Sequence, residues 1–393
     1  MTDVMAVPTP TSEIPLCSSP PDVVVDALGA TVALRFSADM TPGFRDVVSR
    51  AWEGARAQDA EQPDLVVEVP DPRLDGGHDR ALSALSNDVT HRLIAHRLGQ
   101  AWMVHAGGVA DSQGRVCMLV GPSGAGKTTA VRRLSRAFAY VSDENVTVES
   151  DGRVHPYRKP LSIVVAGERW RCEIPPRALR LGDLPAGELR LAVIVILRRS
   201  SSAPATPRPT PVDTLTAIEE LARQSSGLVC GTSPLATIAA HVRRAAVFRL
   251  EYRDNTELRP HIAALLDGAH AGSGAEVAVE PPSIEFEPRP RAGTIVTASF
   301  VDAVSDASDT LVLQRTTGDA GAVTRLTGIA PTIWRACRGG ASQREIAAAV
   351  VAEHGLPPMG LPFARSLQST IDVMQRGGLL REAGPSDAEV SEG

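Results

Sequence analysis

The stretch Gly121-Pro122-Ser123-Gly124-Ala125-Gly126-Lys127-Thr128 matches the phosphate-binding pattern G-x-x-x-x-G-K-[ST] at every fixed position. An apolar run, Val116-Cys117-Met118-Leu119-Val120, precedes it, and a helical pattern begins at Thr129. Glycines let backbone N–H groups wrap a phosphate at the start of a helix, where unpaired donors and the helix dipole favour an anion. The sequence therefore predicts a strand, a phosphate-binding loop (P-loop) and a helix.

The composition of basic residues sharpens this prediction. Of the 40 basic residues only two are lysines, Lys127 and Lys159. In so arginine-rich a chain, a lysine in the loop indicates a task that the planar guanidinium of arginine does not perform. Lys127 is expected to reach the β- and γ-phosphates of a nucleotide, and the Thr128 hydroxyl to bind Mg²⁺.

Length and composition exclude several classes of protein. A chain of 393 residues with 43% hydrophobic residues suits two or three domains. No apolar run reaches the roughly 18 residues of a membrane span, and the first twenty residues lack the pattern of a signal peptide. The five scattered cysteines, without a C-x-x-C pair, indicate reduced thiols in the cytoplasm and no zinc site. A net charge of −6 argues against a general nucleic-acid partner.

Composition divides the chain into a large and a small domain. We expect a disordered segment over 1–20, a first domain over 21–266, a Pro/Gly-rich linker over 267–290, a second domain over 291–383 and a disordered tail over 384–393. In the first domain, hydrophobic period predicts strands at 23–36, 65–69, 140–148, 189–197 and 247–252 and helices at 42–57, 79–100, 212–224, 232–246 and 256–266, with 200–211 as a loop. In the second it predicts strands at 294–300 and 310–315 and helices at 328–337, 342–354 and 362–376.

Three further side chains are candidates for the nucleotide site. Asp143 and Glu144 lie on the strand after the P-loop helix, where they follow Tyr140-Val141-Ser142, and we expect this strand to lie beside the P-loop strand. Phosphoryl transfer needs a metal-binding acid and a base for the incoming hydroxyl, which these carboxylates could supply, although two acids in a solvated turn are the alternative. His105 lies on a strand that returns to the P-loop strand through the turn Asp111-Ser112-Gln113-Gly114. A lone histidine is more often structural, but the hairpin favours a site residue.

Together these features resemble the HPr kinase/phosphorylase family, whose catalytic core is shared with phosphoenolpyruvate carboxykinase. The resemblance rests on His105-Ala106-Gly107-Gly108, on the P-loop, on Ser142-Asp143-Glu144 and on the stretch from Val154 to Leu161. It implies an α/β mixed-sheet kinase core that forms oligomers. It also implies ATP at Gly121, Pro122, Ser123, Gly124, Ala125, Gly126, Lys127, Thr128 and Thr129, Mg²⁺ at Thr128 and Asp143, and catalytic roles for Lys127, Asp143, Glu144 and His105.

Two departures from the family pattern limit what the resemblance implies. The second acid of the pair is Glu144, one methylene longer than the aspartate of the family. Thr129 stands where the full-length bacterial enzymes carry an acid. These differences argue against phosphorylase activity and against HPr as the substrate, and the chain is similar to the smaller HPr-kinase-like enzymes of biosynthetic settings.

The second domain is similar to the PqqD-like family of small winged-helix-type domains, which bind the leader segments of ribosomally made peptides by strand addition. The similarity rests on Leu326–Trp334, on Cys337–Ser342 and on a final helix that ends at Gly377-Gly378. An exposed strand edge near 310–315 would give main-chain hydrogen bonds to an extended peptide. A generic helical cap and a DNA-binding winged helix are the alternatives. Residues 291–393 contain nine Arg and no Lys against eleven Asp and Glu, which argues against DNA.

The combined prediction is an ATP- and Mg²⁺-dependent kinase that phosphorylates a Ser or Thr hydroxyl of a ribosomally synthesised precursor peptide. The leader would bind to residues 291–383, and fusion of the two domains would raise the effective concentration of the peptide. Partner modification enzymes would then act on the same peptide. Two rivals remain open: a small-molecule kinase with a regulatory module, and a nucleotide-gated scaffold that recruits peptide without phosphoryl transfer.

Overall fold

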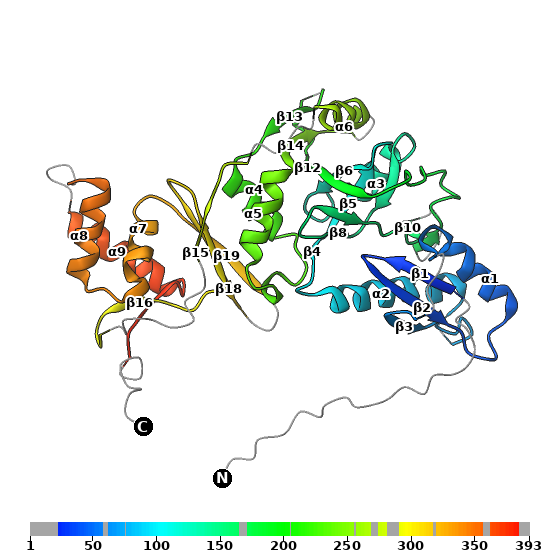
Figure 1. The fold of residues 1–393 in the computed structure, drawn as a ribbon, viewed down its shortest axis with the longest axis horizontal. Coiled ribbons are helices and arrows are strands. Elements are labelled where there is room, and N and C mark those ends of the chain that lie inside the picture. The colour runs from blue at the N-terminus through cyan, green and yellow to red at the C-terminus, as the bar shows by residue number, and fades with distance from the viewer. Residues whose placement is uncertain are drawn as a thin grey trace, which may run out of the picture.

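The computed structural model (Figure 1) describes residues 23–57, 62–74, 76–164, 171–204, 206–254, 257–268, 274–280, 291–316, 320–356 and 362–384. The segments predicted to be disordered, 1–20 and 384–393, lie outside these residues apart from Gly384. Helices and strands alternate and build several sheets, so the chain is a mixed α/β protein. None of the described helices combines the length and the apolarity that crossing a membrane requires.

A three-stranded sheet and two helices form the N-terminal part. Its strands are β1 (Val23–Ala27), β2 (Ala30–Arg35) and β3 (Leu65–Glu68), in that order across the sheet. Helices α1 (Pro42–Ala51) and α2 (His78–Arg97) place apolar side chains in the same core as the strands. The helix predicted for 42–57 ends earlier, at Ala51, and a 3-10 turn follows at Glu53–Ala55.

A nine-stranded sheet occupies the centre of the molecule. Its strands are β4 (Trp102–Val104), β5 (Ala106–Ala110), β6 (Arg115–Val120), β7 (Ala139–Ser142), β8 (Val146–Val148), β9 (Arg153–His155), β12 (Leu189–Arg199), β13 (Arg208–Pro211) and β14 (Ala246–Tyr252). They lie in the order β4-β8-β9-β12-β6-β5-β7, and β14 pairs with both β12 and β13. Because β6 and β14 are parallel to β12, and β5 is antiparallel to β6 and β7, the strands β6, β7, β12 and β14 all run in one direction.

Helices cover both faces of this sheet, which explains why its central strands are continuously apolar. Helices α3 (Lys127–Leu134) and α6 (Leu258–Asp267) cover one face, and α4 (Thr214–Ala222) and α5 (Pro234–Arg244) the other. Along β6, Cys117 and Leu119 pack with α3 and α6, whereas Met118 and Val120 pack with α4 and α5. This alternation follows from the two-residue period of a strand.

Two expectations about the central sheet are wrong. Strand β7, which leads to Asp143, pairs with β5 and not with the P-loop strand β6, so one strand separates them. The segment 200–211, predicted as a loop, ends in β13, which pairs antiparallel with β14. The two prolines of β13 lack N–H donors and are tolerated because β13 lies at an edge of the sheet. A separate hairpin, β10 (Leu161–Val164) and β11 (Arg171–Ile174), was not predicted.

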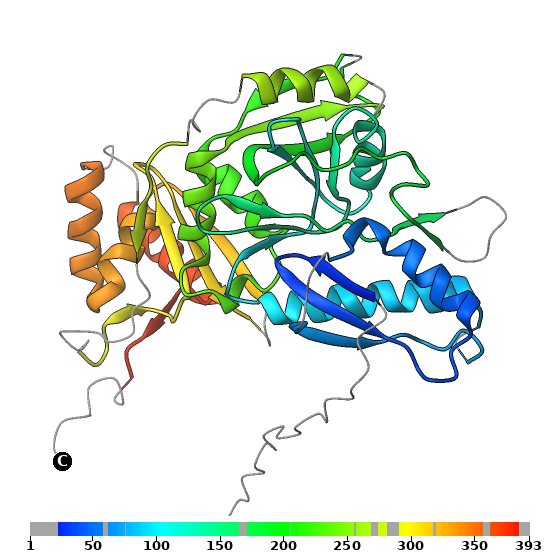
Figure 2. The same cartoon turned by 45° about the vertical axis from the view of Figure 1, so that its right-hand side comes forward.

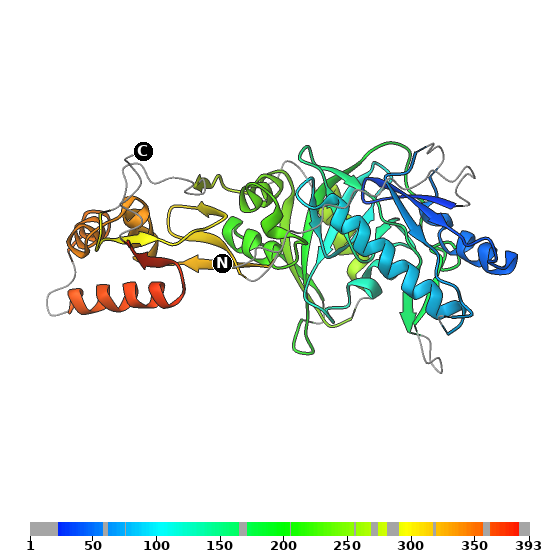
Figure 3. The same cartoon turned by 90° about the horizontal axis from the view of Figure 1, so that it is seen from below.

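The C-terminal part contains two small sheets and three helices. A four-stranded antiparallel sheet consists of β15 (Ala278–Glu280), β17 (Asp302–Ser305), β18 (Thr310–Arg315) and β19 (Gly321–Leu326), in that order. Strand β16 (Ile295–Thr297) pairs with β20 (Leu380–Glu382), and the helices are α7 (Ala330–Ala336), α8 (Gln343–His354) and α9 (Phe363–Arg376). The capping box predicted for Ser342 and Glu345 begins α8. Figure 3 shows these helices at one end of an elongated molecule and β1 to β3 at the other.

The expectation of an exposed edge at 310–315 is wrong. Strand β18 lies between β17 and β19, so its backbone groups are paired on both sides, and the edges of this sheet are β15 and β19. Its side chains are covered on both faces, because Leu311 and Leu313 pack with α4 and α5 whereas Val312 packs with α7 to α9. The predicted linker 267–290 contains the strand β15, which pairs with β17.

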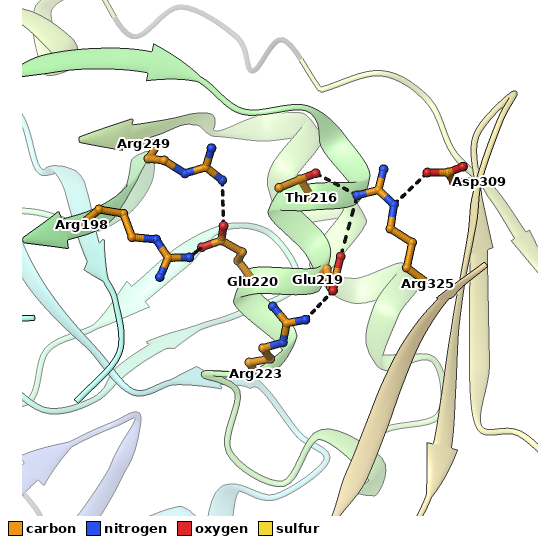
Figure 4. Close-up of polar contacts among 8 residues, drawn as sticks. All are labelled: Arg198, Thr216, Glu219, Glu220, Arg223, Arg249, Asp309 and Arg325. Atoms are coloured by element: carbon orange, nitrogen blue, oxygen red, sulfur yellow. Dashed lines mark hydrogen bonds and ion pairs between the residues drawn. The ribbon is translucent and has the colours of Figure 1, made fainter. Parts of the chain in front are cut away.

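The C-terminal sheet packs directly on the central part of the molecule. Asp302 of β17 is fully buried, and its carboxylate accepts a hydrogen bond of 3.0 Å from the backbone N–H of Ala236 in the first turn of α5. An ion-pair network also joins the C-terminal sheet to α4 (Figure 4). Arg325 of β19 contacts Asp309 at 2.8 Å and, across the boundary, Thr216 at 2.9 Å and Glu219 at 3.8 Å, both on α4.

Candidate active site

The candidate site lies at one edge of the central sheet, where four strand ends meet. The P-loop follows the carboxyl end of β6, Asp143 follows that of β7, and Arg199 ends β12. Strand β5 is antiparallel to these strands, so its amino end, preceded by His105, lies at the same edge. Ligands of open α/β sheets bind outside the carboxyl ends of the parallel strands. Sheet topology therefore brings together residues up to 94 positions apart, from His105 to Arg199.

The P-loop has the conformation that its glycines permit. Gly124 and Gly126 have φ of 80° and 85°, in the left-handed region that other residues avoid. The Lys127 ammonium is buried and donates hydrogen bonds to the carbonyl oxygens of Gly121, at 2.6 Å, and Pro122, at 3.4 Å. Burial lowers the pKa of Lys127. The lysine side chain thus folds back onto its own loop and lies within reach of any anion that the loop binds.

Close packing explains the glycine at position 107, two residues after His105. A Cβ on Gly107 would lie 2.3 Å from a methyl carbon of Val131, so only glycine lets β5 pass this close to α3. On the other side of the loop, the Tyr252 hydroxyl of β14 donates a hydrogen bond to the carbonyl oxygen of Ala125. The P-loop and its helix are therefore held against β5 and β14.

The two acids occupy different environments. Asp143 is buried and accepts a 2.8 Å hydrogen bond from the Tyr140 hydroxyl. Burial raises the pKa of Asp143, while the charge of Lys159 and the bond from Tyr140 act in the opposite direction. The Glu144 side chain is 36% exposed and forms an ion pair of 3.1 Å with Lys159. The turn between the acids and β8 is fixed by Ser142, whose Oγ accepts the N–H groups of Glu144 and Asn145.

Lys159 is the second lysine of the chain and lies in the same cavity as the first. Its side chain is only 5% exposed, and its ammonium also donates to the carbonyl oxygen of Pro160 at 3.2 Å. Burial disfavours the charged form, but Asp143, Glu144 and Glu173 outweigh this effect and raise the pKa of Lys159. Lys159 is therefore an ammonium that offsets a group of carboxylates.

A cavity of about 670 Å³ joins these groups. Most of the predicted site residues line it: His105, Ser123, Gly124, Gly126, Lys127, Thr128, Thr129, Asp143 and Glu144. Gly121, Pro122 and Ala125 belong to the loop but do not line the cavity. Partial burial, and then the Lys127 charge, lower the pKa of His105, so the imidazole is neutral at neutral pH.

Sequence reasoning missed five residues that line the cavity: Ser83, Asn87, Lys159, Ser162 and Arg199. The scarcity of lysine was a usable signal for Lys159. Arg199 is the last residue of β12, two positions after its apolar run, where charged residues mark the end of a buried strand. Ser83, Asn87 and Ser162 carried no signal, because serines and asparagines at helix and hairpin surfaces are ordinary.

The residues predicted to bind Mg²⁺ suit that ion. The Thr128 hydroxyl and the Asp143 carboxylate are oxygen donors at one cavity, next to the loop. Mg²⁺ prefers oxygen ligands and commonly takes one or two protein donors, the rest coming from phosphates and water. A cation bound next to Asp143 would also be favoured, because it would offset the charge of this buried carboxylate.

Comparisons with known proteins give little beyond this geometry. No protein-family model matches the chain, and no curated protein matches its sequence. Among solved structures, the Hpr(Ser) kinase/phosphatase from Coxiella burnetii is similar at 12% identity, covering 42% of this chain and 93% of that chain, with a TM-score of 0.24. A TM-score of this size does not establish a shared fold. The resemblances to the HPr kinase and PqqD-like families therefore stay predictions.

Proposed function

We propose that this protein is an ATP- and Mg²⁺-dependent kinase that transfers the γ-phosphoryl group to a hydroxyl. The observation that carries the proposal is the meeting of both lysines of the chain with the P-loop and the Asp143-Glu144 pair in one cavity. Arginine supplies almost all of the positive charge in this chain, so two buried lysines in one cavity indicate a site built around point charges. Phosphoryl transfer is catalysed by such charges and by positioning.

Each residue has a role that its position supports. The P-loop N–H groups would hold the phosphates, and Lys127 would turn from its own carbonyl partners to the β- and γ-phosphates. Thr128 and Asp143 would hold Mg²⁺, which neutralises charge on the phosphates when bound. Arg199, which lines the cavity, would add a further positive charge. The neutral His105 would orient the phosphate or the acids.

Glu144 would act as the base. The acceptor oxygen forms a bond to the γ-phosphorus, the bond from that phosphorus to the β–γ bridging oxygen breaks, and the proton of the hydroxyl passes to the Glu144 carboxylate. Lys159, whose ammonium forms an ion pair of 3.1 Å with that carboxylate, would hold it in position.

For the acceptor, we propose a Ser or Thr of a ribosomally synthesised precursor peptide, with its leader bound to residues 291–383. On the four-stranded C-terminal sheet, strand addition would use β19 or β15, because these are its edges. Direct packing of this sheet on α4 and α5 would hold a bound leader at a fixed distance from the cavity.

The test is phosphate transfer from ATP to a co-expressed candidate precursor peptide. We expect a mass increase of one phosphate on the peptide with the full chain, ATP and Mg²⁺, and none with Lys127→Ala. A thermal melt of Lys127→Ala establishes that the variant is folded. Transfer to a small molecule alone would support the small-molecule rival, and recruitment of unmodified peptide in the presence of ATP would support the scaffold.

A further inference from the structure

The residues that line the cavity differ in chemistry. The P-loop, Lys127 and Arg199 suit phosphates. Ser83 and Asn87 of α2 and Ser162 of β10 line the same cavity, and these side chains are uncharged. Figure 2 shows α2 running along the border between the N-terminal sheet and the central sheet. Since the nucleotide would occupy the P-loop, the uncharged residues are left as a contact surface for the acceptor.

Helix α2 is fixed to the segments that carry the chemistry. The Thr90 hydroxyl lies 2.7 Å from the Tyr157 hydroxyl, and both are buried. Ser86 donates a 3.4 Å hydrogen bond to Glu173 of β11, and Glu173 accepts a second bond from Ser162. These contacts tie α2 to the β10–β11 hairpin and to the chain two residues before Lys159. The position of the α2 surface relative to the base is therefore set by buried hydrogen bonds.

Ser83 and Asn87 offer neutral donors and acceptors to the cavity. They are four residues apart and so lie on one face of α2. Asn87 is exposed and Ser83 half-buried, and no hydrogen bond within the described part of the chain engages either side chain. An asparagine amide both donates and accepts, which matches the N–H and C=O of a peptide main chain. Neither Ser83 nor Asn87 carries a charge that would pair with a phosphorylated or carboxylated small acceptor.

We propose that the Ser83–Asn87 face of α2 is the acceptor subsite, and that it hydrogen-bonds the main-chain amides flanking the reacting hydroxyl. The acceptor is then an extended peptide whose residues beside the Ser or Thr are uncharged. This inference rests on the proposed kinase function, and it gives that function an acceptor class.

A charge substitution tests the subsite. The full chain, with Mg²⁺ and γ-labelled ATP, is incubated with an array of Ser-containing peptides that carry neutral, acidic or basic residues beside the serine. We expect the unmodified protein to prefer neutral flanks, and Asn87→Asp to shift the preference toward Lys or Arg flanks by about tenfold, because the new carboxylate attracts them. Affinity for a fluorescent ADP analogue should change less than about twofold, since Asn87 belongs to α2 and not to the P-loop.

Two controls separate the possible failures. Ala84→Asp adds the same charge to an exposed position of α2 outside the cavity, and should leave the peptide profile unchanged. Asn87→Ala should raise the KM of the best peptide by about tenfold at nearly constant kcat, because it removes a hydrogen bond made equally in the ground and transition states. An active protein whose profile is the same in Asn87→Asp and Ala84→Asp overturns the subsite alone. A protein that binds the ADP analogue but phosphorylates no peptide overturns the peptide acceptor as well.

Discussion

Replacing Lys159 by methionine should reveal how much the site depends on its second lysine. The substitution keeps an unbranched side chain, one heavy atom shorter, and removes its charge. Asp143 and Glu173 are both about 7% exposed, so loss of Lys159 leaves two buried carboxylates without their cation. Breaking a buried ion pair by removing one partner costs roughly 3–5 kcal/mol. Glu144 is 36% exposed and water screens its charge, so we expect the lower end, about 3 kcal/mol.

Urea and thermal denaturation of the full chain measure this loss. About 3 kcal/mol corresponds to a fall in Tm on the order of 10 °C for a domain of this size. The pKa values of Asp143 and Glu173 are raised by burial, so the folded variant binds more protons than the unfolded one, and its stability should fall as pH rises through these raised values. Lys159→Met with Glu173→Gln should regain part of the loss. A change under about 1 kcal/mol for Lys159→Met would refute the reasoning, because the carboxylates would then not need the ammonium.

Three further predictions concern the base and the packing around the site. Glu144→Gln should abolish phosphate transfer while leaving affinity for the ADP analogue nearly unchanged, and a collapse of that affinity would assign Glu144 to the metal or to structure. His241 is buried and stacked on Trp102, with ring centroids 5.0 Å apart, and burial lowers the pKa of His241 to about 4. The unfolded chain therefore takes up the proton first, and the free energy of unfolding should fall by about 3 kcal/mol between pH 6.5 and 4. Urea melts of His241→Phe should lack this pH-dependent loss. Asp302→Ala should lower the free energy of unfolding by about 1–2 kcal/mol through loss of the α5 cap, and an unchanged urea midpoint would contradict this role.

Local signals predicted most of the elements because they depend on residues close in sequence. The P-loop was recognised from fixed residues and their flanks, and α8 from the reciprocal Ser342–Glu345 bonds. Strand order was harder, since pairing joins residues far apart. The place of β7 beside β5 is supported by Gly107 and Gly108, which allow close approach on both faces, but no local period encodes it.

The error at β18 had a readable cause. Leu311-Val312-Leu313 is a continuous apolar run, which is typical of a strand covered on both faces and not of an exposed edge. For the site, the sequence supplied the P-loop, the acids and the histidine. It could not supply Ser83, Asn87 and Ser162, because these residues reach the cavity only through the packing of α2 and the β10–β11 hairpin.

The shared layer formed by α4 and α5 decides which experiments can separate peptide recognition from catalysis. Glu220 of α4 holds Arg198 of β12 and Arg249 of β14, while its neighbour Glu219 contacts Arg223 on the same helix and Arg325 of the C-terminal sheet (Figure 4). Arg198 precedes Arg199, which lines the cavity.

Deleting residues 291–393 would therefore remove one of the two arginine partners of Glu219 and the cap of α5, and would expose the faces of α4 and α5 that Leu311 and Leu313 cover. The remaining part of the chain would lose stability whether or not the C-terminal sheet binds a leader, so lost activity after such a deletion is no evidence of leader recognition. Substitutions confined to the edge strand β19 leave this layer intact, provided that Val323 and Arg325 are kept. A β19 variant that retains ATP affinity and phosphorylates short leaderless peptides normally, but loses its preference for peptides that carry a leader, would assign recognition to that edge.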